Sequence, residues 1–555
     1  MFVKMASEQY QTNQTQTATR GLITASDGTV LAVDEPTWNI FASLSTDKEE
    51  RKLFFEHKDN FVAEVSGILN IEKSQIEKNI TDDFVYFPIL KNVSTERKKA
   101  LQSAIIFGEG TQGFGLHFEP EERRIYPNGS LASHVLGFIG KTENGNPLGQ
   151  YGIQGYYFGD ITGREGYSYE EKDSSGNVIL TAEYEPILPR NGKNFKLTLI
   201  PNLQTKVEKH LEEGVKLTRS ESGTAILMDP STGAILAMAN YPTYNPNEYW
   251  LASEPWILKN SAVSDVYEYG SVQKPITMAI ALETGAIDKD FRCNDTTGTL
   301  DLFDATGYED LKGKKVYTWN RLPAGDLDIS GILGKSNNPC TAKVALKTNY
   351  PTFYSMLKDF GIGEFIGIGL QEESTSYLRP FEQWTKLDII TASFGQGISA
   401  TSLQVLSALS TIANDGERMR PYVISEITDE KETVKIEPSV LSNPISKETA
   451  EIVQKALQKA VQDNSLGGLA TELKDYDIAA KTGTAEIAKA TETGYEDYAT
   501  NATAIGFAPV ENPKFIMLVK LEEPQISTYA SLTAVPVWKN IFLDIADDLE
   551  ISKKN

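Results

Sequence analysis

Apolar and polar residues in the first third of the chain alternate with two different periods, which predict a mixture of helices and strands. A turn at Asp27-Gly28 separates two short strands within residues 20–32. Residues 144–166 are rich in glycine and predict a loop. The remaining pattern predicts helices over residues 47–69, 74–80 and 94–106, and strands over residues 84–90 and 115–126.

A segment with two prolines and a glycine, residues 185–193, predicts a domain boundary. We therefore expect an N-terminal domain over residues 1–190 and a second domain over residues 191–555. The predicted elements of the second domain are a helix over 203–217, strands over 223–228 and 234–239, a helical block from Val266 onward, strands over 478–480, 502–507 and 514–521, and a helix over 535–545. This order predicts an α+β domain whose sheet gathers strands from both of its ends.

Length and composition narrow the class of protein. The chain has 555 residues, which is more than the ~250–300 residues at which a single core stops growing, so two or more domains are expected. Hydrophobic residues make up 40% and charged residues 23%, an ordinary balance for a folded protein. Lys and Arg number 53 against 76 Asp and Glu, a net charge of −23, which argues against a nucleic-acid partner because such a partner needs a basic face.

Cysteine and histidine point to no metal site. The two cysteines, Cys293 and Cys340, are too few for a disulfide scaffold. One bridge between them is possible, but two buried free thiols are the favoured interpretation. None of the four histidines is three or four residues from another, so local zinc-type spacing is absent, and we expect neither a metal nor another cofactor.

The first candidate motif for chemistry is SVQK at residues 271–274. Ser271 and Lys274 are three residues apart, which places them on one face of a helix. A serine hydroxyl becomes a nucleophile when a neighbouring base takes its proton, and a lysine with a lowered pKa can be that base. Taken alone the motif is weak, since SxxK also occurs at Ser45 and Ser355, and a capping serine beside a solvated lysine explains an isolated match.

Two further motifs follow. SNN at residues 336–338 is followed by Pro339, which should end any helical geometry at Asn338 and begin a helix over residues 340–346. The alternative function for SNN is a helix N-cap. KTGT at residues 481–484 follows an apolar run, and on an edge strand it could pair with an extended peptide. There Gly483 would allow close approach and Lys481 would attract a carboxylate; the alternative is an ordinary edge-strand lysine.

The order of the three motifs is more informative than any one of them. SxxK, SDN-type and KTG motifs occur together in penicillin-binding proteins and class A β-lactamases, and here Ser271, Ser336 and Lys481 follow in that order. No SxN lies between Ser355 and Lys481, so Ser355 cannot begin such a series. A GxSxG elbow is absent, and the phosphate-loop pattern fails because Ile329 stands where a glycine is needed.

The sequence resembles the class B penicillin-binding proteins, the monofunctional peptidoglycan transpeptidases, over almost its whole length. The matching segments are RGLI at 20–23, RRIYP at 123–127, HVLG at 134–137, MDPSTGAILAM at 228–238, NPN at 245–247, FGQGI at 394–398, GFAP at 506–509 and AVP at 534–536. The N-terminal segments separate this family from stand-alone β-lactamases. The resemblance implies an elongated, non-catalytic pedestal of the dimerisation type, followed by a transpeptidase domain with an antiparallel sheet flanked by helices.

The resemblance also implies a role for each motif residue. Ser271 matches the acylated nucleophile and Lys274 its general base. Ser336 and Asn338 match the residues that relay a proton and hold the substrate amide. The third motif matches the part of the site that binds the substrate's terminal carboxylate, and the expected oxyanion hole consists of two backbone N–H groups. The residues concerned are Lys481, Thr482, Gly483 and Thr484 for the third motif, and Ser271 and Thr484 for the oxyanion hole.

The implied reaction is acyl transfer on peptidoglycan stem peptides that end in D-Ala-D-Ala, with β-lactams as mimics that trap Ser271. Alternatives are a β-lactamase or β-lactam sensor, and a catalytically silent scaffold for wall synthesis. Two departures from the family pattern lie beside the nucleophile, where Tyr269 and Gln273 replace a usual proline and aromatic. They bear on substrate fit and leave the catalytic heteroatoms in place.

The resemblance carries expectations about location and partners as well. Residues 1–19 are polar and no apolar run approaches the roughly 18–20 residues of a membrane span. The family has an N-terminal anchor just before the segment that matches residues 2–11, so we expect an extracytoplasmic domain tethered to the bacterial cytoplasmic membrane by an anchor that this chain lacks. The implied partners are a membrane glycosyltransferase and other division or elongation proteins.

Overall fold

The computed structural model describes residues 11–44, 46, 48–81, 85–104, 114–171, 187–376, 378–463, 468–489 and 495–554. The chain forms two compact units, Ala32–Pro127 and the combination of Met1–Leu31 with Asn128–Asn555. The expected division after residue 190 is a different one and stays a proposal. Part of the predicted boundary segment, residues 185 and 186, and the segment 2–10 lie outside the described residues.

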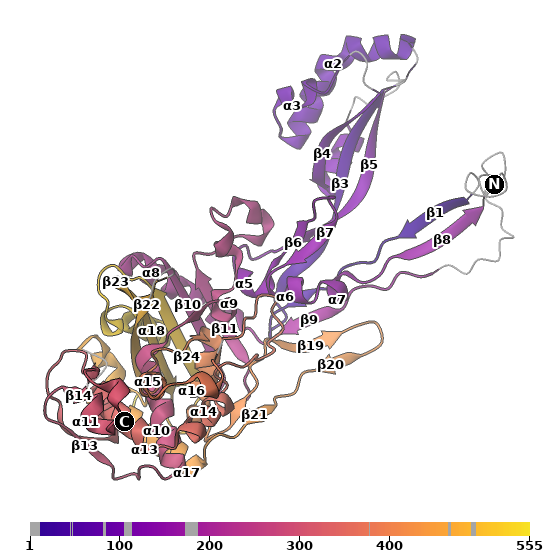
Figure 1. The fold of residues 1–555 in the computed structure, drawn as a ribbon. Helices are drawn as coiled ribbons and strands as arrows, with labels where there is room; N and C mark the ends of the chain where they lie inside the picture. Colours follow the sequence, from indigo (N-terminus) through magenta and orange to yellow (C-terminus); the bar gives the residue numbers. More distant parts are fainter. Residues whose placement is uncertain are drawn as a thin grey trace. The chain divides into compact units, whose positions relative to one another are not determined.

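The unit Ala32–Pro127 is built on a three-stranded antiparallel sheet in which β3 pairs with both β4 and β5 (Figure 1). Its elements are β3 (Val30–Leu44), α2 (Lys48–Leu69), α3 (Lys73–Glu77), β4 (Tyr86–Ser94), α4 (Thr95–Gln102) and β5 (Phe114–Ile125). Phe54, Phe61 and Val65 of α2 are buried in one cluster with Ile40 and Phe87 of the sheet. The predicted helices and strands are confirmed here, although residues 47, 84, 105 and 106 lie outside the described part.

The remaining N-terminal residues form short elements in the larger unit. They are β1 (Gln11–Gln16), β2 (Ile23–Thr24), α5 (Ser133–Leu136), β6 (Phe138–Lys141), β7 (Pro147–Gln150), α6 (Gly152–Tyr156), α7 (Phe158–Thr162), β8 (Gly166–Glu171) and β9 (Asn194–Leu197). β2 pairs with β9, which pairs with a later hairpin, β19 (Ile424–Thr428) and β20 (Thr433–Lys435). Segments far apart in sequence therefore share one sheet.

The prediction of a loop over residues 144–166 is wrong, because β7, α6 and α7 occupy most of it. Its glycines serve close packing. A Cβ on Gly149 would lie 2.0 Å from the carbonyl oxygen of Gln154, and one on Gly152 would lie 2.4 Å from that of Val135. Short elements that touch through their backbones need glycine, and this hides their periodicity.

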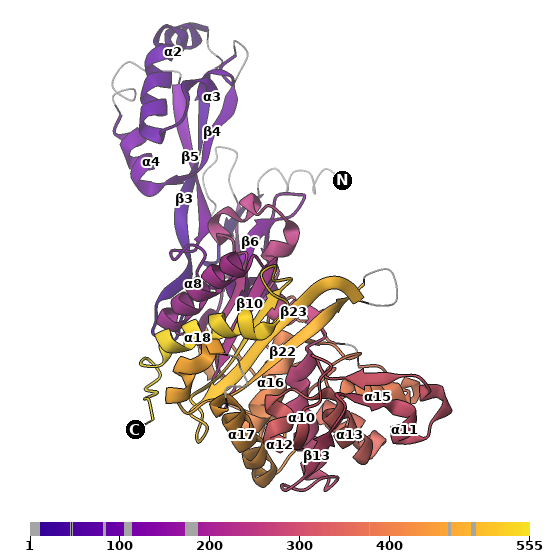
Figure 2. The same ribbon diagram turned by 90° about the vertical axis from the view of Figure 1, so that its left-hand side faces the viewer.

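Five antiparallel strands form the centre of the larger unit, in the order β11-β10-β24-β23-β22. Figure 2 labels three of them, β10, β22 and β23. Their bounds are β10 (Ser222–Met228), β11 (Ile235–Tyr241), β22 (Ala479–Ala488), β23 (Tyr495–Ala508) and β24 (Phe515–Glu522). The first two strands come from the start of the expected domain and the last three from its end. The α+β prediction and the sheet that gathers both ends are confirmed, and β22 lies at the edge.

Helices cover both faces of this sheet. α8 (Pro201–Thr218) and α18 (Ala534–Ile545) pack on one face, where Leu227 and Val519 are fully buried. On the other face, Ile505 and Ile516 meet α10, α16 and α17. The helices of this block are α9 (Ser261–Ser264), α10 (Lys274–Glu283), α11 (Leu302–Thr306), α12 (Ile329–Gly334), α13 (Asn338–Lys347), α14 (Tyr350–Asp359), α15 (Lys386–Ala392), α16 (Ser402–Ala413) and α17 (Lys447–Gln462).

Short ladders and 3₁₀ turns complete the unit. The ladders are β12 (Val266–Tyr267) with β17 (Ala400–Thr401), β13 (Arg292–Asp295) with β16 (Gly325–Asp328), β14 (Thr299–Asp301) with β15 (Lys315–Tyr317), and β18 (Arg418–Met419) with β21 (Val440–Ser442). The 3₁₀ turns are η2 (Pro246–Leu251), η3 (Pro255–Leu258), η4 (Gly270–Gln273), η5 (Glu309–Leu311), η6 (Phe381–Gln383), η7 (Gly468–Asp475) and η8 (Ala530–Leu532). Among the described residues, no helix combines the length and apolar character needed to cross a membrane.

Cys293 on β13 and Cys340 on α13 form a disulfide, with their Cα atoms 5.9 Å apart. The favoured interpretation of two free thiols is therefore wrong. The two residues are 47 positions apart in sequence and meet only because β13 packs against α13 in the tertiary fold. Spacing along the chain carries no information about such a contact.

Candidate active site

Ser271 and Lys274 meet at a junction between two helical segments. Ser271 lies on η4, and Lys274 is the first residue of α10. Lys274 Nζ lies 2.5 Å from Ser271 Oγ. The side chain of Lys274 is fully buried, whereas Ser271 remains partly exposed. The geometry suits a serine nucleophile with an adjacent base.

Ser336 connects the first motif to the third. Its Oγ lies 3.0 Å from Lys274 Nζ and 3.1 Å from Lys481 Nζ. Lys274 also donates to the backbone carbonyl of Ser336 at 3.0 Å. The structure thus brings together the four residues Ser271, Lys274, Ser336 and Lys481 in one hydrogen-bonded chain. A hydroxyl between two amines can accept a proton from one side and pass one on from the other.

Both lysines of this chain have lowered pKa values. Burial lowers the pKa of Lys274 well below its usual value, and the neighbouring charge of Lys481 lowers it further. Burial also lowers the pKa of Lys481 to about 7. A lysine whose pKa is lowered in this way can be neutral, and hence a base, near neutral pH.

The helix at the second motif begins two residues earlier than predicted, so the expectation that Pro339 would keep Asn338 out of helical geometry is wrong. Asn338 is the first residue of α13, and Asn337 caps the helix by accepting a hydrogen bond from the amide of Cys340. The interpretation of SNN as an N-cap therefore applies to Asn337, and Ser336 lies just before the helix. Asn338 Nδ2 donates to the carbonyl oxygen of Tyr317 at 3.1 Å.

An open pocket brings together the remaining predicted residues. Its lining includes Ser271, Ser336, Asn338, Thr482 and Thr484. Lys481 is almost fully buried beside it and donates to the backbone oxygen of Thr482 at 2.7 Å. Thr482 and Thr484 lie on β22, the edge strand predicted for KTGT. A pocket with a strand edge, hydroxyl groups and two buried amines suits an extended peptide that ends in a carboxylate.

Close approach of backbones fixes the serine against β22. A Cβ on Gly483 would lie 2.7 Å from the carbonyl oxygen of Tyr269, and one on Gly270 would lie 2.9 Å from that of Thr484. The segments that carry the N–H groups of Ser271 and Thr484 are therefore in contact. Two N–H groups on adjoining segments beside a nucleophile are the arrangement expected of an oxyanion hole.

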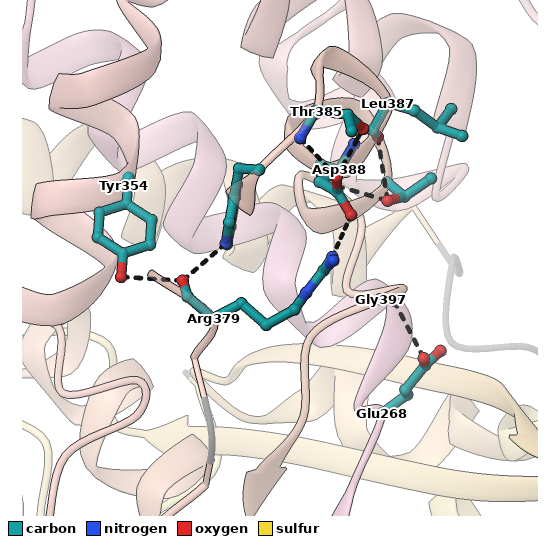
Figure 3. Close-up of polar contacts among 9 residues, drawn as sticks. Glu268, Tyr354, Arg379, Thr385, Leu387, Asp388 and Gly397 are labelled. Atoms are coloured by element: carbon teal, nitrogen blue, oxygen red, sulfur yellow. Dashed lines mark hydrogen bonds and ion pairs between the residues drawn. The ribbon is translucent and has the colours of Figure 1, made fainter. Parts of the chain in front are cut away.

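A loop after α15 contacts the segment that leads to the serine. Gly395 accepts a hydrogen bond from the amide of Gly270 at 3.1 Å, and the amide of Gly397 donates to Glu268 Oε1 at 3.1 Å (Figure 3). At the start of this helix, Arg379 forms an ion pair with Asp388 (Figure 3). The loop is thus attached at two points, Gly270 and Glu268, in the segment just before the nucleophile. Sequence reasoning missed Glu268, which no motif rule singles out.

Tyr269 and Gln273, the two residues beside the nucleophile that differ from the family pattern, contact each other. The buried Tyr269 donates from its hydroxyl to Gln273 Oε1 at 2.9 Å, and Gln273 Nε2 lies 3.4 Å from Thr277 Oγ1. Thr277 in turn donates to the carbonyl oxygen of Ser393 at 2.7 Å. These buried side chains therefore join the segment that carries Ser271 to α10 and to the backbone at Ser393.

Comparisons with known proteins agree with this geometry. The family model "Penicillin binding protein transpeptidase domain" matches residues 223–543, and "Penicillin-binding Protein dimerisation domain" matches residues 15–197. The chain is 29% identical over 534 residues to the probable peptidoglycan D,D-transpeptidase PenA of Neisseria meningitidis, which covers 95% of this chain and 84% of that protein. It is 28% identical over 531 residues to the peptidoglycan D,D-transpeptidase FtsI of Escherichia coli, with 95% and 83% covered.

A solved structure shows a similar fold. Penicillin Binding Protein 2X from Streptococcus thermophilus superposes with a TM-score of 0.76 and 24% sequence identity, over 98% of this chain and 81% of that one. The fold expected from the resemblance, an N-terminal dimerisation domain followed by an antiparallel sheet flanked by helices, is confirmed.

Proposed function

This chain belongs to the penicillin-binding protein transpeptidase family and is a peptidoglycan D,D-transpeptidase, and we propose that Ser271 carries its acyl-enzyme. One observation carries the proposal. Lys274 Nζ lies 2.5 Å from Ser271 Oγ, at the end of a hydrogen-bonded chain that continues through Ser336 to Lys481. The two lowered lysine pKa values supply a base where the nucleophile needs one.

The first half-reaction forms an ester. Neutral Lys274 takes the proton of Ser271, and Oγ attacks the carbonyl carbon of the penultimate D-Ala of a stem peptide. The N–H groups of Ser271 and Thr484 stabilise the resulting oxyanion. The C–N bond then breaks, and the departing amine of the terminal D-Ala takes its proton from Lys274 through the hydroxyl of Ser336, which lies 3.0 Å from Lys274 Nζ.

The second half-reaction forms the cross-link. The amine of a neighbouring stem peptide attacks the ester carbonyl, and its proton passes to Lys274. Collapse of the tetrahedral intermediate releases Ser271 Oγ, which regains a proton from the same lysine. The bonds formed and broken mirror the first half-reaction, so one set of residues serves both.

The third motif positions the substrate. We assign the terminal carboxylate to the hydroxyls of Thr482 and Thr484, near the charge of Lys481. Asn338 Nδ2 is held by the carbonyl of Tyr317, which leaves its carbonyl oxygen to accept from the substrate amide. Pairing of the peptide along the exposed edge of β22 would set the register of the scissile bond.

The test is intact-protein mass after incubation with a penicillin, for wild type and Ser271→Ala. We expect a stable adduct of one penicillin on wild type and none on Ser271→Ala. A stable adduct on both proteins would show that the nucleophile is a residue other than Ser271. Rapid hydrolysis without an adduct would favour a β-lactamase, and neither adduct nor hydrolysis would favour a silent scaffold.

We further propose that the chain works outside the cytoplasm, at the outer face of the cytoplasmic membrane. The Cys293–Cys340 disulfide supports this location, because disulfides persist in oxidising compartments. A membrane glycosyltransferase and other division or elongation proteins are the proposed partners, since a cross-linking enzyme needs newly polymerised glycan strands as its substrate. Co-purification from detergent-solubilised membranes would test this assignment.

A further inference from the structure

The second motif is attached to a neighbouring ladder by a disulfide and by one buried carboxylate. Cys293 on β13 is bonded to Cys340 in the first turn of α13. Two residues further along β13, Asp295 Oδ2 accepts a hydrogen bond from Asn337 Nδ2 at 2.7 Å. Asp295 and Asn337 are almost fully buried, with 2% and 1% of their surfaces exposed. The segment Ser336-Asn337-Asn338 is therefore held by a hydrogen bond at its middle residue and by a covalent bond at Cys340, two residues beyond its end.

The same carboxylate extends the attachment to the rim of the pocket. Asp295 Oδ1 accepts from the amide of Gly298 at 2.8 Å, and the carbonyl of Gly298 accepts from the amide of Thr318 at 2.9 Å. The residue before Thr318 is Tyr317, whose carbonyl receives the side-chain amide of Asn338. Asp295 is thus hydrogen-bonded directly to Asn337. It is also connected to Asn338 indirectly, through the backbone of Gly298 and of the adjacent residues Tyr317 and Thr318.

Ser336 needs this support because of its backbone. Its φ is +52°, a left-handed conformation that an L-residue other than glycine rarely adopts and that persists only where surrounding contacts fix it. Its Oγ must stay within hydrogen-bond reach of two amines at once, Lys274 Nζ at 3.0 Å and Lys481 Nζ at 3.1 Å. A displacement of about 1 Å in such a site can slow the reaction by about 10²-fold.

We propose that Asp295 is a positioning residue for Ser336 and Asn338, and that the Cys293–Cys340 disulfide holds the same segment so that acylation of Ser271 depends on both attachments. The inference rests on the proposed function of Ser271. Asp295 touches neither the substrate nor the reacting atoms. It acts through Asn337, the middle residue of the motif, which family resemblance treats as variable.

The first test compares the kinetics of acylation by a fluorescent penicillin in wild type, Asp295→Ala and Asp295→Asn. The asparagine variant keeps one acceptor oxygen, so it retains one of the two hydrogen bonds. The matched control is Asp326→Ala on the paired strand β16. Asp326 lies opposite Asn294 and bonds the exposed Arg292 at 2.7 Å, so this variant removes a carboxylate from the same ladder without touching the motif.

We expect Asp295→Ala to lower the saturating rate constant of acylation by about 10²-fold. We expect a smaller change in the apparent dissociation constant for the penicillin. Asp295→Asn should fall between the alanine variant and wild type, and Asp326→Ala should match wild type. The fraction of protein that reacts is recorded separately, because loss of folding lowers that amplitude and leaves the rate constant of the folded fraction unchanged.

The second test opens the disulfide in the folded protein. A water-soluble phosphine reduces it: two electrons break the S–S bond, Cys293 and Cys340 each gain a proton, and the phosphine becomes its oxide with the oxygen of water. After removal of the reductant, we expect slower acylation at an unchanged reactive fraction. The double variant Cys293→Ser/Cys340→Ser should be as slow without treatment and should not respond to it.

The outcomes separate this inference from the proposed function. If wild type itself forms no adduct at Ser271, the proposed function fails. If wild type reacts while Asp295→Ala reacts with the same rate constant, or with only a smaller amplitude, the positioning role is wrong. If reduction leaves the rate constant unchanged, the role of the disulfide is wrong.

Discussion

The two walls of the active-site pocket are held in place by different kinds of contact. The serine wall consists of η4, the loop at residues 393–397 and β22, and its parts meet mainly through backbone atoms at glycine positions, with side-chain contacts to the loop from Glu268 and Thr277. The second-motif wall consists of Ser336, Asn337 and Asn338 with β13, and its parts meet through side chains, the Asp295 carboxylate and a disulfide.

This difference indicates which changes each wall can tolerate. Backbone contacts do not depend on side-chain identity, so the serine wall can accept Tyr269 and Gln273 in unusual positions as long as its glycines remain. Side-chain contacts depend on every partner, so the second-motif wall should lose its geometry when a single carboxylate is removed.

The largest effect is expected where the two walls meet, at Lys274. Its Nζ contacts Ser271 on one wall and Ser336 on the other. Removal of a general base typically costs 10²–10⁴-fold, so Lys274→Ala should slow acylation by about 10³-fold or more. Stopped-flow measurement with a fluorescent penicillin checks this. A suitable control is Lys335→Ala, which removes a more exposed lysine from the same pocket lining. Equal effects of the two substitutions would contradict the assigned role of Lys274.

The next effect should come from a methyl group placed inside the serine wall. Gly395 has a φ of +80°, and a Cβ there would lie 2.1 Å from the carbonyl oxygen of Gly270. We expect Gly395→Ala to lower the free energy of unfolding by about 3 kcal/mol. We also expect it to lower the rate constant of acylation by about 10²-fold. Denaturant unfolding and stopped-flow acylation measure the two effects.

Gly397→Ala is the matched control for this substitution. Gly397 also has a positive φ, +73°, but the nearest atom to its Cβ would be Thr391 Oγ1 at 3.4 Å, an ordinary contact. Gly397→Ala should lower the free energy of unfolding by only about 1 kcal/mol, which is the cost of placing an alanine in a left-handed conformation. If both variants behaved alike, close backbone packing would not be what holds the serine wall.

Lys481 reaches from the serine wall to Ser336, and its titration should appear in the pH dependence of stability. Burial lowers its pKa to about 7 from the usual 10.5, so the unfolded chain binds more protons than the folded protein between these values. Stability therefore rises with pH through this window. Lys481→Met should remove about 2–3 kcal/mol of that rise between pH 7 and pH 10, as measured by urea unfolding.

The same substitution should change the pH profile of acylation. The charge of Lys481 lowers the pKa of Lys274, so its removal should move the ascending limb of the acylation rate to higher pH. We expect the rate at neutral pH to fall by about tenfold. An unshifted limb together with an unchanged slope of stability against pH would show that Lys481 does not titrate as the structure implies.

The contrast between the walls also explains what the sequence could predict. The spacing of apolar residues was enough to predict the helices and the central strands. Each of these elements buries one or both faces, and this leaves a regular pattern in the local sequence. The residues of the three motifs were identifiable because their order along the chain is informative. The sequence did not identify three other features, because each depends on a contact that only the tertiary fold creates. They are Asp295, Glu268 and the Cys293–Cys340 bridge. The glycine-rich elements at 144–166 were missed because close backbone packing erases the apolar pattern.

The smallest effect is expected for Tyr269→Phe, which removes one buried hydroxyl two residues before the nucleophile. The hydroxyl of Tyr269 donates to Gln273 Oε1 at 2.9 Å, and Tyr269 is almost fully buried. Loss of a buried hydrogen bond, with Gln273 left without that donor, should lower the free energy of unfolding by about 1–2 kcal/mol. Acylation should stay within about twofold of wild type, because Gly270, Gly395 and Gly483 hold the serine through backbone contacts that this substitution leaves intact. Urea unfolding and stopped-flow acylation on one preparation measure both. A loss of acylation as large as that of Asp295→Ala would mean that side chains, and not backbone contacts, hold both walls.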